Sequence, residues 1–376
     1  MRIVVTGGGT GGHIYPGLAI AEALRRRAPD VEVLFVGGRR LEAHIVPKEG
    51  WPFRAIAGRG LPRPASIGTI VALGAAALGG AQALALLWRW RPDAVVATGG
   101  YVCAPVGAAA VALGVPLVLQ EQNVRAGLAN RVLARWARWV SLPTPEAASS
   151  LPARAAAATG VPVREAALRG DRARAHARWG LEAGRLTVLV LGGSQGARSL
   201  NAAICRLADL LMYDARVQVL HQTGAADLET VRRAIGHREH VGPPAVRHVA
   251  AAFLDPIGDA YACADLVVCR AGASTLAEVT AWGLPAVLVP YPHAATAHQD
   301  ENAAVLARAG AALVVPDRAL AGTALLEAVG GLLDDPARRA AMAAASRTLG
   351  RPDAADVVAD RVLALARAAR GEEALA

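Results

Sequence analysis

A glycine-rich loop that ends in a histidine stands near the start of this 376-residue chain. It reads Gly7-Gly8-Gly9-Thr10-Gly11-Gly12-His13, directly after the apolar run 3–6 and before a stretch of helical spacing. A strand that enters such a loop and then a helix directs backbone N–H groups and the positive end of a helix dipole toward an anion or a sugar. His13, at the rim, has the chemistry of a general base. The alternative is that the glycines only make the turn and that His13 caps or packs there.

The same order of strand, glycine loop and helix returns in the second half, at 186–191, 192–197 and from Ser199 onward. Further along, a turn of small residues at 270–275 opens a helix that carries Glu278. Ser274 and Thr275 suit a phosphate, and a carboxylate about one turn along can accept both hydroxyls of a ribose. The alternative is that Ser274 and Thr275 only cap this helix and that Glu278 faces solvent.

Short runs rich in Val and Leu alternate with Ala/Leu/Arg stretches of helical period along the whole chain. This alternation predicts parallel α/β units, and the length suggests about two domains. The composition shifts to Ala, Pro and Arg between 143 and about 181. We therefore expect an N-terminal Rossmann-like domain over 1–160 and a C-terminal one over 161–349. We also expect a helix at about 350–370 that packs back on the first domain.

Two more predicted strands of the first half end in polar or glycine residues. Gly99-Gly100-Tyr101-Val102 follows the strand 94–97, and Gln120-Glu121-Gln122-Asn123 follows the strand 117–119. Ligands of open α/β sheets lie beyond the carboxyl ends of the strands, so these exits and the first glycine loop are expected at one rim. Glu121 and Asn123 are the side chains expected to reach a ligand there, although Glu121 could equally cap the next helix.

The formal net charge of +9 and the pI near 10.2 suit an anionic partner. Nucleic acid is disfavoured because no basic block is interleaved with aromatic residues. The four cysteines show no CxxC spacing and are expected to be structural thiols of a reducing compartment. The sequence opens directly into a predicted strand, so no secretory signal is expected.

No charged residue lies between Arg63 and Arg89. The segment is long enough to span a bilayer, but four glycines and several polar residues weaken that interpretation. The alternatives are a helix buried in the first domain and an interfacial helix. We expect a mixture of these two, with one face on the core and with Ile67, Ile70 and Val71, flanked by Arg63 and Arg89, on an anionic membrane surface.

Six motifs then occur in order over most of the chain, and six ordered motifs are a specific signal. They are Gly7 to His13, Gly99-Gly100-Tyr101-Val102, Glu121-Gln122-Asn123, Gly192-Gly193-Ser194-Gln195-Gly196-Ala197, Arg270 to Thr275 with Glu278, and His298-Gln299 with Asn302-Ala303. Together they resemble the MurG family, the peripheral membrane GT-B glycosyltransferases of bacterial peptidoglycan synthesis. The resemblance implies two Rossmann-like, doubly wound parallel-sheet domains that face each other across a cleft.

The resemblance also implies a reaction. N-acetylglucosamine (GlcNAc) would pass from UDP-GlcNAc to the C4 hydroxyl of MurNAc-pentapeptide on undecaprenyl diphosphate, which turns lipid I into lipid II with inversion at the anomeric carbon. The expected partners are UDP-GlcNAc, lipid I, the cytoplasmic face of the cell membrane and other cell-wall synthesis proteins. No tightly bound cofactor and no obligatory divalent metal is implied, and the sequence has no Asp-x-Asp pair.

Matched motif by motif, the resemblance implies a role for each site residue. Leu254 would hold the uracil through its backbone and Glu278 the ribose. The diphosphate would lie against Ser194, Ala273, Ser274, Thr275 and Leu276, with positive charge from Arg164. Asn123 and His298 or Gln299 would read the donor sugar. Thr10, Gly11 and Gly12 would bind the donor, and the acceptor would lie against the same three residues and His13. Gly100 and Tyr101 would bind the acceptor. His13 is the expected base and Glu121 the less favoured one.

Two positions depart from the family pattern. Gln120 stands where the family has a histidine, which rules out a base at that position, and Val161 replaces an asparagine just before Arg164. A UDP-GlcNAc 2-epimerase would share the fold but need no lipid. A dinucleotide oxidoreductase would place an acid at the end of the second strand, and Gly37-Gly38-Arg39 stands there instead. A lipid-docking module without enzyme activity leaves the second half unexplained.

Overall fold

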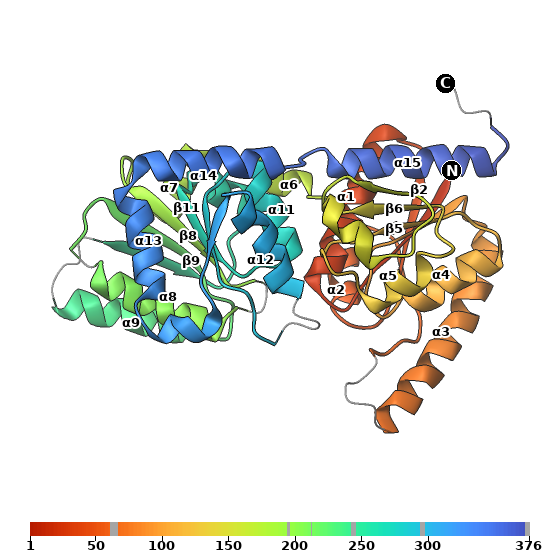
Figure 1. Cartoon of the computed structure of the whole chain (residues 1–376). Coiled ribbons are helices and arrows are strands. Elements are labelled where there is room, and N and C mark those ends of the chain that lie inside the picture. Colours follow the sequence, from red (N-terminus) through yellow and green to blue (C-terminus); the bar gives the residue numbers. More distant parts are fainter. Residues whose placement is uncertain (61–66, 194–195, 212, 242–245, 294–297, 373–376) are drawn as a thin grey trace. The chain divides into compact units, whose positions relative to one another are not determined.

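The computed structural model describes residues 1–60, 67–193, 196–211, 213–241, 246–293 and 298–372. The chain divides into two compact units, which are shown in Figure 1. Unit 1 comprises Met1–Arg164 and Arg351–Ala376, and unit 2 comprises Glu165–Gly350. The division lies after Arg164, close to the Pro- and Ala-rich region in which the sequence placed it.

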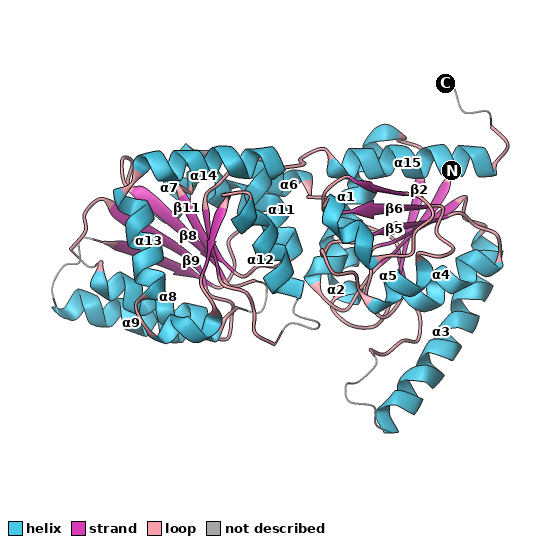
Figure 2. Cartoon of the chain, in the orientation of Figure 1, coloured by secondary structure: helices cyan, strands magenta, loops and turns pink. Residues whose placement is uncertain are grey.

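Unit 1 is a parallel sheet of seven strands with helices on both faces (Figure 2). Its elements are β1(Arg2–Thr6), α1(Gly11–Arg27), β2(Glu32–Gly37), α2(Glu42–Lys48), β3(Phe53–Ala55), α3(Ile67–Trp90), β4(Ala94–Ala97), α4(Cys103–Ala112), β5(Leu117–Gln120), α5(Leu128–Leu133), β6(Trp139–Leu142), η1(Pro145–Ser150), β7(Ala156–Ala158) and α15(Ala354–Ala369). The strand order is β3-β2-β1-β4-β5-β6-β7, with β1 paired to both β2 and β4.

Both faces of this sheet are covered, which is why its strands are continuous apolar runs rather than alternating ones. Ile3 and Val5 belong to a core that also contains residues of α1 and α15. Val4 points to the other face and belongs to a core with α3, α4 and α5. The last helix thus completes the core of the first unit, and Arg26 of α1 pairs with Asp356 of α15 at 2.7 Å.

Unit 2 repeats the architecture with a six-stranded parallel sheet in the order β10-β9-β8-β11-β12-β13. Its elements are α6(Glu165–Leu168), α7(Arg172–Trp179), β8(Leu186–Leu191), α8(Arg198–Leu210), β9(Val217–Gln222), α9(Leu228–Val241), β10(Arg247–Ala251), α10(Ile257–Cys263), β11(Leu266–Cys269), α11(Ala273–Trp282), β12(Ala286–Leu288), α12(His298–Arg308), β13(Ala312–Val314), η3(Asp317–Ala321), α13(Ala324–Asp334) and α14(Pro336–Leu349). Both units are therefore doubly wound, as the sequence predicted.

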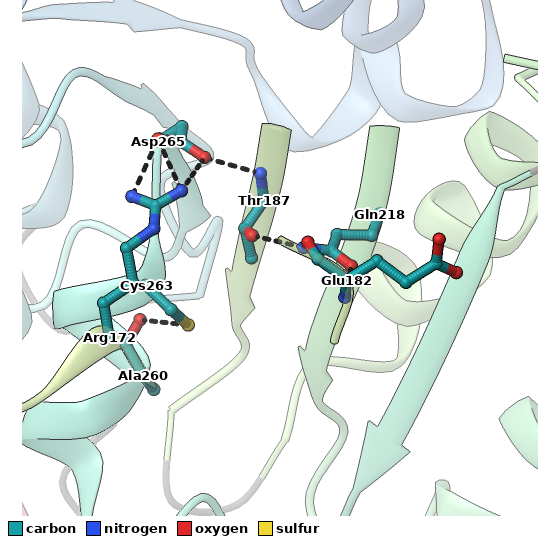
Figure 3. A network of polar contacts seen from close by, with 7 residues as sticks. All are labelled: Arg172, Glu182, Thr187, Gln218, Ala260, Cys263 and Asp265. Atoms are coloured by element: carbon teal, nitrogen blue, oxygen red, sulfur yellow. Dashed lines mark hydrogen bonds and ion pairs between the residues drawn. The ribbon is translucent and has the colours of Figure 1, made fainter. Parts of the chain in front are cut away.

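A polar network joins the amino ends of three strands of unit 2 (Figure 3). Asp265, just before β11, accepts the backbone N–H of Thr187 on β8 at 2.8 Å and pairs with Arg172 of α7 at 3.1 Å. Gln218 of β9 donates to Thr187 Oγ1 at 3.0 Å and to the Glu182 carbonyl at 3.1 Å. These polar groups at the amino ends of the strands bond to one another, whereas open α/β sheets bind ligands at the carboxyl ends.

The sequence analysis did not predict the strands β3, β7 and β13. Each has three residues and lies at an edge of its sheet. An edge strand of this length is too short to show a hydrophobic pattern, and the Ala-Ala-Ala of β7 has no intrinsic strand preference. These strands form because a neighbouring strand offers a row of unpaired backbone groups.

Helix α3 has one buried face and one exposed face. Ala72, Ala83 and Leu87 are buried, and α3 packs against α4. The exposed side chains are Ile70, Val71, Leu73, Leu78, Leu84 and Trp88. By length and composition alone, 69–90, with a mean hydropathy of 2.0, could cross a membrane. Arg63 and the side chain of Ile67 lie outside the described residues, and Arg89 is exposed in the last turn.

The packing of α15 on unit 1 gives a test of its contribution to stability. Leu363 is 3% exposed in the core that α15 shares with α1. We expect Leu363→Ala to lower the free energy of unfolding by about 2–5 kcal/mol, because it removes buried methyl groups and leaves a cavity. Val357→Ala on the same helix is the control, since Val357 is 39% exposed and should cost less than about 0.5 kcal/mol. Urea unfolding of both variants measures the difference, and equal costs would contradict this packing.

Candidate active site

The carboxyl ends of β1 and β4 form the switch point of the first sheet. The two strands are neighbours, and the connections that follow them lead to β2 on one side and β5 on the other. A crevice opens at such a point, where an open α/β sheet binds its ligand. The two loops that leave these strands are the first glycine loop and the turn that contains Gly99 and Gly100.

These two loops pack backbone against backbone. The N–H of Gly8 donates to the Gly99 carbonyl at 3.3 Å. A Cβ on Gly100 would lie 2.1 Å from the Gly8 carbonyl oxygen, and Gly99 and Gly100 have φ angles of +103° and +90°. No residue with a side chain fits this approach, so the glycines set the distance between the loops. The hydroxyl of Thr98 donates to the His13 carbonyl at 2.7 Å and fixes the start of α1.

His13 lies next to this contact, and its two ring nitrogens have different neighbours. Its Nδ1 lies 3.2 Å from the Gly8 carbonyl oxygen and 3.2 Å from Thr10 Oγ1. A carbonyl only accepts, so this contact assigns the proton of the neutral ring to Nδ1 and the basic lone pair to Nε2. Nε2 lies next to Gly99, since a Cβ there would be 3.1 Å from it. The geometry therefore suits a general base at the switch point.

Glu121, the other predicted base, organises its own loop. It is 1% exposed, and Oε1 accepts the N–H groups of Gln122 and Asn123 and the Asn123 side-chain amide at 2.9 to 3.3 Å. Oε2 accepts the N–H of Gly127, which precedes α5, at 3.1 Å and the amide of Asn130 at 2.9 Å. Five donors occupy the carboxylate, which favours the capping interpretation of Glu121 over the catalytic one. Asn123 is fixed at the rim by these same bonds.

Glu42 is a site residue that the sequence analysis missed. It is fully buried in the first turn of α2, and Oε2 accepts the N–H of Gly9 at 3.0 Å. Oε1 accepts the N–H of Gly38 at 3.0 Å and the hydroxyl of Tyr101 at 2.8 Å. Burial and this hydrogen bond raise the pKa of Tyr101 well above its usual range, so the phenol remains a donor. In the sequence, Glu42 is a single acidic residue at the start of a helix after β2, a position that is usually exposed to solvent. Its role is therefore visible only in the folded chain.

Fewer backbone N–H groups of the first glycine loop are available to an anion than its sequence suggests. The N–H groups of Gly8 and Gly9 are taken by Gly99 and Glu42. The first turn of α1, at Gly11 and Gly12, still offers N–H groups that have no partner within the helix. Gly12 is exposed, and no side chain caps this helix. This turn, rather than the whole loop, is therefore the part that can donate hydrogen bonds to an anionic or hydroxyl group.

The two departures from the family pattern are both buried. Gln120 donates to Ser141 Oγ and to the Gly160 carbonyl at 3.2 Å each, and Val161 is 6% exposed. The guanidinium of Arg164 binds Glu22 at 3.0 Å and Glu49 at 2.7 Å. Burial lowers the pKa of Arg164, but the two carboxylates outweigh it and raise the pKa. Arg164 is therefore held by two carboxylates of unit 1, and the expectation that it adds positive charge at the diphosphate stays a prediction.

Unit 2 has its own switch point between β8 and β11, and α11 begins there. Gly272 occupies the N-cap position of α11. Ser274 and Thr275 therefore lie within the first turn and not at the cap. The N–H groups of Ala273, Ser274 and Thr275 precede the first intrahelical bond, from Leu276 to the Gly272 carbonyl. Ser274 Oγ is buried without a hydrogen-bond partner among the described residues. This helix end can bind a phosphate.

Two further residues were predicted at the diphosphate. The side chain of Leu276 is in the core, and Ser194 lies outside the described residues.

Glu278 is oriented by a buried tyrosine that the sequence analysis also missed. The hydroxyl of Tyr261, in α10, donates to Glu278 Oε2 at 2.6 Å, and the Tyr261 ring is 6.5 Å from that of Trp282. Burial and Glu278 raise the pKa of Tyr261 well above its usual range, so the bond keeps its donor. This bond fixes the orientation of the Glu278 carboxylate, and its contact with a ribose stays a prediction.

The remaining predicted donor residues lie around the same sheet edge. The N–H of Leu254 donates to Gln222 Oε1 at 3.1 Å, so a uracil contact at Leu254 is restricted to its carbonyl. His298 and Gln299 begin α12, and Gln299 Oε1 accepts the N–H of Tyr291 at 2.9 Å. Among the described residues, no three His, Cys, Asp or Glu side chains form a group that could hold a metal.

Comparisons with known proteins agree with this architecture. Residues 3–141 match the glycosyltransferase family 28 N-terminal domain, and 187–358 match the corresponding C-terminal domain. A relative from Desulforudis audaxviator is 44% identical over 368 residues, which cover 97% of this chain and 99% of the relative. That relative is named a UDP-N-acetylglucosamine–N-acetylmuramyl-(pentapeptide) pyrophosphoryl-undecaprenol N-acetylglucosamine transferase.

Solved structures also resemble this fold. Acinetobacter baumannii MurG has a TM-score of 0.76 and 27% identity, over 96% of this chain and 99% of that one. A UDP-GlcNAc 2-epimerase from Neisseria meningitidis has a TM-score of 0.67 at 14% identity, over 96% of this chain and 100% of that one, which shows a shared fold alone. The relative from Desulforudis audaxviator is 44% identical over nearly the whole chain, and both family domains match. The chain therefore belongs to glycosyltransferase family 28.

Proposed function

We propose that this chain transfers GlcNAc from UDP-GlcNAc to the C4 hydroxyl of MurNAc in undecaprenyl-diphospho-MurNAc-pentapeptide. The observation that carries the proposal is the 44% identity, over 97% of the chain, to a relative named for this transfer. The matched stretch covers 97% of the chain and therefore extends across both units.

Unit 2 binds the nucleotide in this proposal. Glu278, held by Tyr261, accepts the ribose hydroxyls, and the carbonyl of Leu254 accepts from the uracil. The diphosphate lies at the amino end of α11, where backbone N–H groups, the helix dipole and the hydroxyl of Ser274 stabilise negative charge. These groups bind the leaving UDP more strongly as its charge develops, which lowers the barrier. No tightly bound cofactor or obligatory metal is needed for this step.

Unit 1 activates the acceptor hydroxyl. His13 Nε2 takes its proton as the oxygen attacks C1 of GlcNAc on the face opposite the UDP, so the C1–oxygen bond to UDP breaks and the configuration inverts. The imidazolium that forms is stabilised at Nδ1–H by the Gly8 carbonyl. The acceptor lies against Tyr101, Gly100 and the first turn of α1, which belong to the two loops that leave β1 and β4.

The acceptor is carried on a polyprenyl lipid, and the exposed face of α3 suits a membrane surface. Ile70 and Val71 are 71% and 50% exposed on a helix whose other face is in the core. Arg89 lies at the end of the same helix and can attract anionic lipid. Insertion of the apolar side chains, with this arginine, would hold the enzyme peripherally on the cytoplasmic face of the cell membrane.

The direct test offers radiolabelled UDP-GlcNAc with and without a lipid I analogue. We expect a lipid-linked disaccharide only when the acceptor is present. Conversion of UDP-GlcNAc to its 2-epimer without acceptor would instead support the epimerase alternative, with which the chain shares the fold.

His13→Ala should lower kcat by roughly a hundredfold or more, because general-base catalysis contributes about that factor. The KM for UDP-GlcNAc should stay within about twofold, since the nucleotide groups lie in unit 2. His44→Ala is the control, because His44 is exposed on α2. A matching loss of donor affinity in His13→Ala would make His13 a binding residue instead.

Tyr261→Phe should raise the KM for UDP-GlcNAc roughly tenfold, since a hydrogen bond to a charged group contributes about 1.5 kcal/mol or more. The KM for the acceptor should not change. Tyr213→Phe, at a tyrosine that is 79% exposed, removes the same hydroxyl without a buried partner and serves as the control. Steady-state kinetics with each substrate varied separately gives both constants, and an unchanged donor KM would refute the role of Tyr261.

Replacement of Ile70 and Val71 together by serine should weaken binding to vesicles of anionic phospholipid roughly tenfold or more, since each buried side chain contributes about 1.5–3 kcal/mol. Thermal stability should not fall, because both side chains are exposed. Val357→Ser on α15 is the control for an exposed valine elsewhere in unit 1. Vesicle flotation measures the binding, and equal flotation of all three proteins would place the membrane contact on another surface.

A further inference from the structure

The peptide group between Gly8 and Gly9 is bonded on both of its edges. Its N–H, on Gly9, donates to Glu42 Oε2 at 3.0 Å. Its carbonyl oxygen, on Gly8, lies 3.2 Å from His13 Nδ1. The peptide is trans, so the N–H and the carbonyl point in opposite directions. One planar group thus separates a buried carboxylate on one side from the imidazole on the other.

Glu42 cannot shift within this arrangement. Its second oxygen is fixed by the N–H of Gly38 and the hydroxyl of Tyr101. The Glu42 side chain packs closely against two glycines. A Cβ on Gly8 would lie 2.7 Å from the Glu42 carboxyl carbon, and one on Gly37 would lie 2.9 Å from Glu42 Cγ. Three donors from three strand exits therefore hold the carboxylate, which compensates the cost of burying its charge.

This carboxylate has two effects on the peptide. Hydrogen bonds to an ionised acceptor are shorter and stronger than neutral ones, so Glu42 fixes the plane of the Gly8–Gly9 peptide. A hydrogen bond at the N–H also polarises the carbonyl, which then accepts more strongly from the next donor in the chain. That donor is Nδ1–H of His13. A base needs such a third group to fix its tautomer and orientation.

From this arrangement we infer that Glu42 is a positioning residue, which orients His13 through the Gly8–Gly9 peptide and keeps its Nε2 directed at the acceptor hydroxyl. The arrangement corresponds to a carboxylate–histidine pair with one peptide group inserted between the members. Tyr101 contributes to the same arrangement, because its hydroxyl donates a hydrogen bond to the other oxygen of Glu42. The inference depends on the role of His13 as the base given under Proposed function.

The test measures Glu42→Gln in the native chain and in a His13→Ala background. The amide keeps the size of the side chain but replaces one accepting oxygen by a donor, so either Gly9 or the Gly38–Tyr101 pair loses its acceptor. We expect kcat to fall roughly tenfold or more, because misplacement of a catalytic group by about 1 Å costs up to a hundredfold. The KM for UDP-GlcNAc should stay within about twofold.

The His13→Ala background identifies how Glu42 acts. If Glu42 works through His13, Glu42→Gln adds no further loss of kcat once the imidazole is gone. Losses that multiply in the double variant would overturn the inference, as would an unchanged kcat in the single variant. Glu32→Gln is the control, since Glu32 carries a largely exposed carboxylate in the same unit.

Tyr101→Phe decides the question if Glu42→Gln does not fold. It retains the carboxylate and the Gly9 bond and removes one donor from Glu42. A fall in kcat with His13 present and none in the His13→Ala background supports the inference, and equal falls in both backgrounds overturn it. If His13→Ala by itself leaves kcat unchanged, the assignment of the base fails, which is a separate result from a failure of Glu42→Gln.

Discussion

The close contact between the loops after β1 and β4 determines where His13 lies in unit 1. Gly8 donates to the Gly99 carbonyl, and Gly100 leaves no space for a side chain next to the Gly8 carbonyl. Because the two backbones touch, α1 begins at a fixed point over the sheet and His13 lies directly above the switch point. Thr98 fixes the same turn through the His13 carbonyl. Each of these bonds depends on residues far apart in the sequence.

The two units use a similar strand, loop and helix for different electrostatic tasks. In unit 1 a buried carboxylate, Glu42, takes up the loop N–H of Gly9. In unit 2 the amino end of α11 has no side-chain cap, and Ser274 Oγ has no partner among the described residues. A neutral hydroxyl can be deprotonated beside the first arrangement, whereas a diphosphate is stabilised by the second. The difference matches the proposed division between acceptor and donor.

Several arginines form ion pairs and hydrogen bonds within their own unit. Arg164 pairs with Glu22 and Glu49, and Arg270 binds Asp317 at 2.9 Å while it donates to the Val289 and Pro290 carbonyls. Arg174 pairs with the buried carboxylate of Asp259. Arginine suits these tasks because its planar guanidinium makes several hydrogen bonds at once. The excess of arginine in the sequence is thus a poor guide to where anions bind.

The sequence by itself determined the parallel α/β class, the repeated unit and the strand exits that carry the glycine motifs. These features are local, since a continuous apolar run, a glycine loop and a helical period each occupy one short segment. The tertiary structure alone decided what the carboxylates do. Glu121 accepts five hydrogen bonds from its own loop and from Asn130 of α5, whereas Glu42 connects three strand exits and Tyr261 orients Glu278. The role of a buried polar group depends on which distant donors the fold brings to it, and no local pattern records that.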